Sequence, residues 1–146
     1  MPMAERTAEV TWTGTLAKGS GVLTLRSGAM RELPVTWASR TERSDGKTSP
    51  EELIAAAHAS CFSMAFSSML DEAGMPPDRL EVSATCTLDK TDAGLRVTSS
   101  ALRVRGVVPG IDEARFRAVA EAAKDGCPIS NLLKGNATLS VEAELA

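Results

Sequence analysis

The stretch from Lys47 to Phe66, KTSPEELIAAAHASCFSMAF, carries the strongest helix signal in the chain. Ser49 is a good N-cap, Pro50 suits the first helical position, and Glu52 follows the cap by three residues, which completes a capping box. From Leu53 to Leu70, small and apolar residues cover nearly every face, a pattern typical of a helix enclosed by protein. We therefore expect one long, buried helix at the centre of the fold.

Runs with strand character lie on both sides of this helix, and two further helices are expected after it. Alternating apolar and polar residues, separated by Gly, Asp and Ser turn signals, indicate the strands. This order predicts an α+β fold with an antiparallel sheet. The expected elements are strands at Thr7–Gly14, Gly21–Arg26 and Leu33–Trp37, an exposed loop at Ala38–Thr48, strands at Leu80–Leu88 and Leu95–Val108, helices at Asp112–Lys124 and Pro128–Lys134, and a strand at Thr138–Leu145.

Composition restricts the class of protein. With 146 residues, 43% hydrophobic and 24% charged, the chain fits a single folded domain spanning residues 1–146. A net charge of -3 and the absence of a basic stretch interleaved with aromatics argue against a nucleic-acid partner. No run reaches the roughly 18 uninterrupted apolar residues of a membrane span, and no secretory pattern opens the chain. We therefore expect a cytoplasmic protein with no membrane partner.

Three cysteines, Cys61, Cys86 and Cys127, are too few and too scattered for a disulfide framework, and no Cys/His spacing suggests a zinc site. We expect no metal and no cofactor.

Cys61 lies 12 residues past the helix cap, about 18 Å along the axis, so the positive helix end cannot ionise it. Burial would keep this thiol inert unless a fixed cation reaches it. An inert structural thiol and a reactive thiol activated by a cation both fit the helix pattern.

The other candidate residues differ in their setting. Cys127 follows Gly126 and precedes Pro128, which predicts the N-cap of a short helix, where backbone N–H groups can stabilise a thiolate. Cys86 shares strand parity with apolar residues and is expected to be a small core residue. His58, the only histidine, stands three residues before Cys61, a poor geometry for a nucleophile and base on one helix, so we expect a packing or polar-support role.

Several motifs together closely resemble the osmotically inducible protein C (OsmC) branch of the OsmC/Ohr family of thiol peroxidases. They are the helix motif TSPEELIAAAHASCFSMA, the polar segment WASRTE before it, the turn DAG at Asp92–Gly94, VPGID at Val108–Asp112, and GCPISNLLK at Gly126–Lys134. The likeness spans almost the whole chain, and the histidine at position 58, where the Ohr branch usually has Tyr, favours the OsmC side.

The resemblance implies a hydroperoxide reductase acting in oxidative-stress defence, with organic hydroperoxides preferred over hydrogen peroxide. Cys61 matches the peroxidatic cysteine and Cys127 the resolving one, so that a sulfenic acid at Cys61 becomes a Cys61–Cys127 disulfide. Arg40 matches the arginine that activates the thiolate, and Glu51 the glutamate that pairs with this arginine. An external dithiol, such as a lipoyl-type donor, must then reduce the disulfide. The implied fold is an antiparallel sheet wrapped on a long central helix.

The implied assembly is an intertwined homodimer, and helix geometry agrees with it if Glu51 has the role that the resemblance implies. Glu51 and Cys61 are ten residues apart on one expected helix, or about 15 Å along its axis. They cannot share a site within one straight helix. If Glu51 orients the arginine at Cys61, it must come from a second chain.

Two other functions fit some of these residues. A hydrolase with Cys61 and His58 as nucleophile and base would not need Cys127. A redox sensor or ligand-binding module could form the same Cys61–Cys127 disulfide without rapid turnover, because a sensor and an enzyme both require an oxidisable thiol pair.

Overall fold

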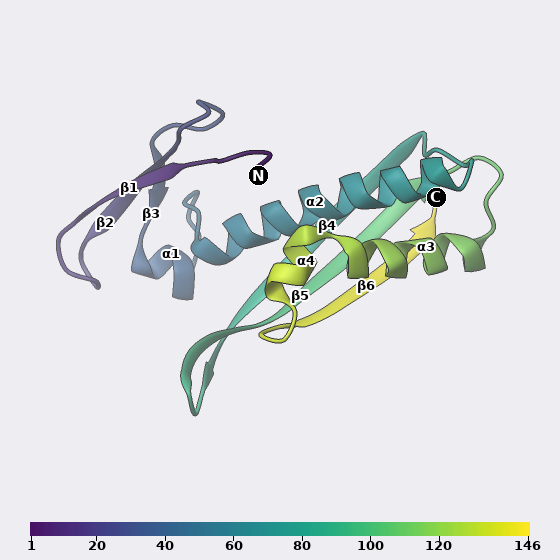
Figure 1. Cartoon of the computed structure of the whole chain (residues 1–146). Helices are drawn as coiled ribbons and strands as arrows, with labels where there is room; N and C mark the ends of the chain where they lie inside the picture. Colours follow the sequence, from purple (N-terminus) through teal and green to yellow (C-terminus); the bar gives the residue numbers. More distant parts are fainter. The chain divides into compact units, whose positions relative to one another are not determined.

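The computed structural model describes all 146 residues and divides the chain into two compact units, Met1–Pro50 and Glu51–Ala146, which are described separately (Figure 1). The α+β class predicted from the sequence is confirmed, with ten elements in place of the nine expected. In chain order they are β1 (Ala8–Thr13), β2 (Ser20–Leu25), β3 (Leu33–Val35), α1 (Trp37–Thr41), α2 (Pro50–Glu72), β4 (Arg79–Thr91), β5 (Gly94–Val107), α3 (Glu113–Gly126), α4 (Pro128–Leu133) and β6 (Thr138–Leu145).

The first unit contains a three-stranded sheet with strand order β1-β2-β3, both pairings antiparallel, followed by helix α1. This helix is the element that the sequence did not predict, since Ala38–Thr48 was expected to be a loop. Thr36 caps it, accepting a hydrogen bond from the backbone N–H of Ser39, while the Ser39 hydroxyl accepts one from the backbone N–H of Thr36. The reciprocal bonds satisfy N–H groups at the helix start and explain why so short a segment is helical.

The second unit contains a sheet with strand order β4-β5-β6. Strands β4 and β5 form the predicted antiparallel hairpin, and Gly94, with φ of +102°, supplies the left-handed conformation at its turn. Strand β6 pairs with β5 in parallel, so the expectation of a purely antiparallel sheet is wrong for this strand. The reason is the connection: α3 and α4 form a crossover between β5 and β6, and a crossover returns the chain in the same direction.

Helix α2 begins at Pro50, as its cap signals predicted, and ends at Glu72 before Gly74, which has φ of +79°. Within the second unit one face of this helix is covered: His58, Phe62, Phe66 and Leu70, four residues apart, are fully buried. The side chain of Met64, by contrast, is 71% exposed. The helix therefore presents a second face that the second unit does not cover, although the sequence pattern predicted enclosure on nearly all sides.

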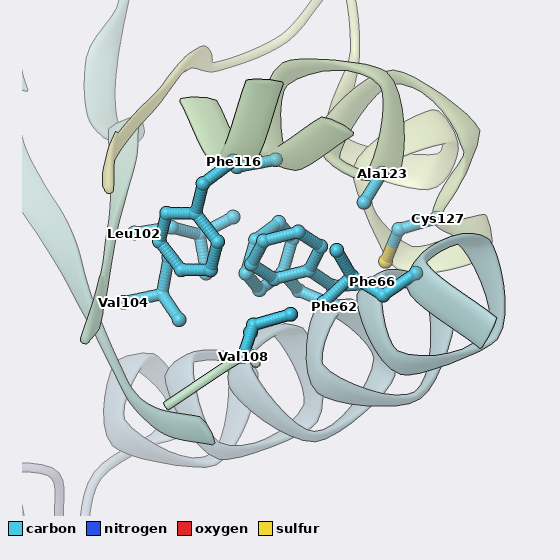
Figure 2. Packing of buried hydrophobic residues seen from close by; sticks show 10 residues of the cluster. Phe62, Phe66, Leu102, Val104, Val108, Phe116, Ala123 and Cys127 are labelled. Carbon is cyan, nitrogen blue, oxygen red and sulfur yellow. The ribbon is translucent and has the colours of Figure 1, made fainter. Parts of the chain in front are cut away.

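By length and composition α2 could cross a membrane, with a mean hydropathy of 1.5 over its most apolar 18 residues. Core helices of soluble proteins have the same composition. The buried face of α2 packs into a cluster with side chains from β5 and α3 (Figure 2), as the face of a core helix does.

The aromatic rings at the centre of this cluster join α2 to α3. The Phe66 ring lies 5.4 Å from that of Phe62 and 5.1 Å from that of Phe116, measured between centroids. Such tilted contacts between rings are favourable beyond the area that they bury. Strand β5 approaches Phe116 through Gly106, where an added Cβ would lie 2.8 Å from the ring, too close for any other residue. Cys127 lies in the same cluster and is fully buried (Figure 2).

Candidate active site

The site is built where helix α2 meets the start of helix α4. Cys61 lies in the middle of α2 and is partly buried, whereas Cys127 ends α3 and is the N-cap of α4, as the sequence predicted. The two side chains are hydrogen-bonded to each other, and Cys61 also has a hydrogen bond with the backbone of Ile129 in the first turn of α4. The structure thus brings together the two cysteines that the sequence singled out, and both are free thiols.

Burial is the largest influence on the protonation state of Cys61. It raises the pKa of the Cys61 thiol above its ordinary value, and the hydrogen bond that the Cys61 S–H donates to the Cys127 sulfur raises this pKa further. The backbone hydrogen bond from Ile129 has the opposite effect, since an N–H group stabilises a thiolate. Burial is the largest of these influences, so the surroundings of Cys61 within the second unit favour the neutral thiol.

His58 lies one helical turn before Cys61 and is fully buried. Its Nδ1 atom is 2.6 Å from the hydroxyl of Ser100 in β5, and its Nε2 atom is 2.8 Å from the hydroxyl of Ser130 in α4. Both ring nitrogens therefore have hydroxyl partners, and a histidine so engaged is unsuited to be the base for Cys61. This geometry argues against the hydrolase reading and agrees with the polar-support role expected for His58.

Glu51, the second residue of α2, is 6% exposed and lies close enough to Cys86 in β4 for its charge to raise the pKa of that thiol, in addition to the effect of burial. Cys86 is half-buried and is not among the residues of the core cluster, so the expectation of a core residue is not met. The ten residues that separate Glu51 from Cys61 on the same unbroken helix correspond to about 15 Å. The structure of one chain therefore does not bring this carboxylate to the Cys61 thiol.

Arg40 belongs to the first unit and lies in α1, not in the loop that the sequence predicted. Its side chain is half-buried, and its guanidinium carbon is 6.0 Å from the centre of the Trp37 ring, within the range of a cation–π contact.

Three residues of the site were not identified from the sequence: Ser100, Ser130 and Ile129. Ser100 could have been suspected, because it shares strand parity with the buried Leu102 and Val104, and a polar residue on a buried face requires a partner. Ser130 and Ile129 give no comparable signal, since their contacts depend on how α4 meets α2.

Comparison with known proteins agrees with this fold. The family model described as OsmC-like protein matches residues 43–142. The chain is 44% identical over 131 residues to the peroxiredoxin OsmC of Escherichia coli, covering 90% of this chain and 91% of that protein. It is 32% identical over 108 residues to the organic hydroperoxide resistance protein-like 1 of Staphylococcus epidermidis, covering 71% and 75%.

A solved structure also matches the fold. The organic hydroperoxide resistance protein OhrB of Bacillus subtilis superposes with a TM-score of 0.75 at 26% identity, over 94% of this chain and 98% of that one. The α+β arrangement and these matches define a protein of the OsmC/Ohr class. The chain belongs to the OsmC family.

Proposed function

We propose that this chain is a cysteine-dependent peroxidase that reduces organic hydroperoxides, and hydrogen peroxide more weakly, in defence against oxidative stress. The observation that carries the proposal is the side-chain contact between Cys61 and Cys127, which are far apart in sequence. Relatives across most of the chain are named peroxiredoxin OsmC and organic hydroperoxide resistance protein, which supports the same reaction. All of residues 1–146 would serve as one peroxidase domain.

In the proposed reaction the Cys61 thiolate attacks one oxygen of the hydroperoxide. The O–O bond breaks, an alcohol leaves, and Cys61 becomes a sulfenic acid. Cys127 then forms a disulfide with Cys61, which protects the oxidised sulfur from a second peroxide. An external dithiol, such as a lipoyl-type donor, returns both cysteines to thiols by exchange. The protein would work in the cytoplasm, where reductants of this kind keep thiols reduced.

The raised pKa of Cys61 makes an activating cation necessary, and we assign that role to Arg40. A guanidinium beside the sulfur would stabilise the thiolate and then the negative charge that develops on the departing oxygen. Glu51 would hold this arginine in place. Because Glu51 is about 15 Å along α2 from Cys61 of its own chain, the carboxylate would come from the second subunit of a homodimer. The open face of α2 around Met64 supports such an assembly.

The test is steady-state reduction of cumene hydroperoxide and of hydrogen peroxide with dihydrolipoyl or other dithiol donors. Wild type should turn over many times, and Cys61→Ser should show no activity above the uncatalysed background. Cys127→Ser should react once and then stop with an oxidised Cys61. Cys86→Ser, a matched loss of a thiol on β4, should keep the wild-type rate. Activity that survives in Cys61→Ser would refute the mechanism, and disulfide formation without turnover would indicate a redox sensor instead.

A further inference from the structure

The single histidine of the chain forms a buried bridge between sheet and helix. His58 contacts Ser100 on β5 through Nδ1, at 2.6 Å, and Ser130 on α4 through Nε2, at 2.8 Å. Ser100 is fully buried and Ser130 is 1% exposed. A buried polar bridge that is fully paired fixes the position of the elements it joins. Helix α4 is therefore held in place by a side chain of α2 that is itself anchored to the sheet.

This bridge lies next to the thiol pair. His58 precedes Cys61 by three residues on α2, and Ser130 follows Cys127 by three residues along the chain. The contacts His58–Ser130 and Cys61–Cys127 thus pair the two segments in opposite chain directions. Three residues of helix correspond to about 4.5 Å, so the two contacts are neighbours on one side of α2. Both contacts join the same two elements.

The chemistry of the bridge is that of a neutral imidazole. Burial lowers the pKa of His58, so the ring carries one N–H donor and one acceptor nitrogen. One serine hydroxyl accepts from the ring and the other donates to it. Neither nitrogen is left to take a proton from Cys61 or Cys127, so any effect of His58 on these thiols is exerted through the position of α4.

We propose that His58 is a positioning residue that, through Ser130, holds Cys127 against Cys61 and so sets the rate of disulfide formation. The inference rests on the proposed peroxidase function. In the step concerned, the Cys127 sulfur attacks the sulfur of the Cys61 sulfenic acid. The S–S bond forms as the S–O bond breaks, and the departing hydroxide takes the Cys127 thiol proton to become water. Both oxidising equivalents come from the hydroperoxide already consumed.

Loss of the bridge should therefore slow the second oxidation step much more than the first. Cys61 reacts with peroxide without help from α4 beyond the Ile129 hydrogen bond, whereas attack by Cys127 depends on close alignment of the two sulfurs. When Cys127 is displaced, the sulfenic acid lives longer and meets a second hydroperoxide, which converts it to a sulfinic acid.

The experiment is single-turnover oxidation of the full-length, reduced protein by cumene hydroperoxide, quenched at intervals and measured by mass spectrometry. Dimedone reports the sulfenic acid at Cys61, and the loss of two alkylatable thiols reports the disulfide. In Ser130→Ala the disulfide should form about tenfold more slowly, the effect of about 1.4 kcal/mol in the barrier. Formation of the sulfenic acid should slow much less, because only the Ile129 hydrogen bond links α4 to that step. With excess peroxide the sulfinic form should accumulate.

Two further variants exclude a general loss of structure. Ser63→Ala removes a hydroxyl that bonds to the Ala59 carbonyl within α2, and it should leave both rates unchanged. His58→Asn, whose shorter side chain cannot span the bridge, should show the same split between the two rates as Ser130→Ala. The double variant His58→Asn/Ser130→Ala should be no slower than the slower single variant, because both changes break one contact.

Disulfide formation in Ser130→Ala within about twofold of wild type would overturn the inference, as would an equal slowing of both steps. Additive effects in the double variant would also overturn it, since they would mean that the two residues act separately. If wild type itself forms no Cys61–Cys127 disulfide, both the proposed peroxidase mechanism and the role of His58 are refuted. If wild type forms the disulfide and Ser130→Ala forms it equally fast, only the role of His58 is refuted.

Discussion

Burial opposes charge at two single residues one helical turn apart, His58 and Cys61. The imidazole is kept neutral and the thiol is kept protonated by the same loss of contact with water. For His58 this state suits a structural bridge. For Cys61 it creates a requirement, because a peroxidatic sulfur must be a thiolate at the moment of attack.

The arginine proposed to meet that requirement can be tested through the thiol itself. Arg40→Ala should raise the Cys61 pKa further, because a neighbouring opposite charge stabilises the ionised form of a thiol. The measurement is the rate of Cys61 alkylation across a pH series in a Cys86→Ser, Cys127→Ser background. Arg43→Ala is the matched control, since Arg43 is strongly exposed and its nearest carboxylate, on Asp45, is 4.0 Å away. An unchanged pH midpoint in Arg40→Ala would remove Arg40 from the mechanism.

The neutral state of His58 predicts how stability depends on pH. Its pKa in the folded state is below the ordinary value of 6.5, so the unfolded chain binds this proton more readily. The free energy of unfolding should be insensitive to this group above pH 6.5 and should fall as the pH drops below it, by at most about 1.4 kcal/mol per pH unit until the folded-state pKa is reached. Urea denaturation at several pH values measures this slope. His58→Asn should be less stable at neutral pH but should lack the histidine contribution to the slope, and an identical slope in both proteins would contradict the assignment.

At the scale of elements, helix α2 is the element of the second unit against which the sheet and the crossover helices pack. Its covered face joins the sheet and the crossover helices through the three phenylalanine rings of the core. Phe66 is the middle ring of the three, in contact with Phe62 on its own helix and Phe116 on α3. The attachment of α3, and with it the placement of α4 and Cys127, depends on this packing.

Phe66→Ala should therefore lower the free energy of unfolding by about 3–5 kcal/mol, because it leaves a cavity between two helices. Thermal or urea unfolding of the reduced protein measures the loss. Leu95→Ala, an apolar residue of β5 that is 51% exposed, is the control and should change stability by less than about 0.5 kcal/mol. A small effect of Phe66→Ala would mean that the core closes around the missing ring.

Local signals predicted most of these elements, and contacts distant in sequence explain the differences. The start of α2 was identified because its cap, its proline and its acidic first turn are all local. Helix α1 was missed because Ser39 occupies the position where a capping box usually has Glu or Gln. The direction of β6 was missed because apolar and polar residues alternate in the same way in parallel and antiparallel strands.

The residues of the candidate site also differ in whether local sequence features could identify them. Cys61 and Cys127 could be chosen from residue type, helix position and family motif, and the structure places them in contact. The Ser130 hydroxyl and the Ile129 N–H could not be chosen, because no local pattern tells which side of α4 meets α2. The roles of Arg40 and Glu51 stay predictions, since they depend on contacts beyond one unit of one chain.

At the scale of the whole molecule, the proposal requires two chains. In the mixed assembly of Glu51→Ala with Cys61→Ser, one site combines an intact Cys61 with an intact Glu51, and the other site lacks both. Each parent homodimer should be nearly inactive. The heterodimer, made by co-expression with two affinity tags, should recover about half of the wild-type activity, because one of two sites is complete.

The control is the same mixture made with Cys61→Ser and Cys127→Ser. These two cysteines lie in one chain's site in this structure, so the mixed dimer should contain no complete site. Heterodimers of Glu51→Ala and Cys61→Ser that are no more active than their parents would refute the sharing of Glu51 between subunits. Analytical ultracentrifugation of the wild type would show directly whether the chain is a dimer.

The parallel pairing of β6 with β5 has a consequence for how the protein is made. During synthesis, β5 leaves the ribosome well before β6, because the whole crossover of α3 and α4 must be translated between them. At ordinary rates of translation, one edge of β5 is without its partner for a time on the order of seconds. An unpaired strand edge invites association with other nascent chains, and charged side chains are a usual defence against it. Arg103 and Arg105 lie on β5 and pair with Glu142 and Glu144 once β6 has been synthesised. These arginines can thus protect the growing polypeptide from aggregation before they contribute to the finished sheet.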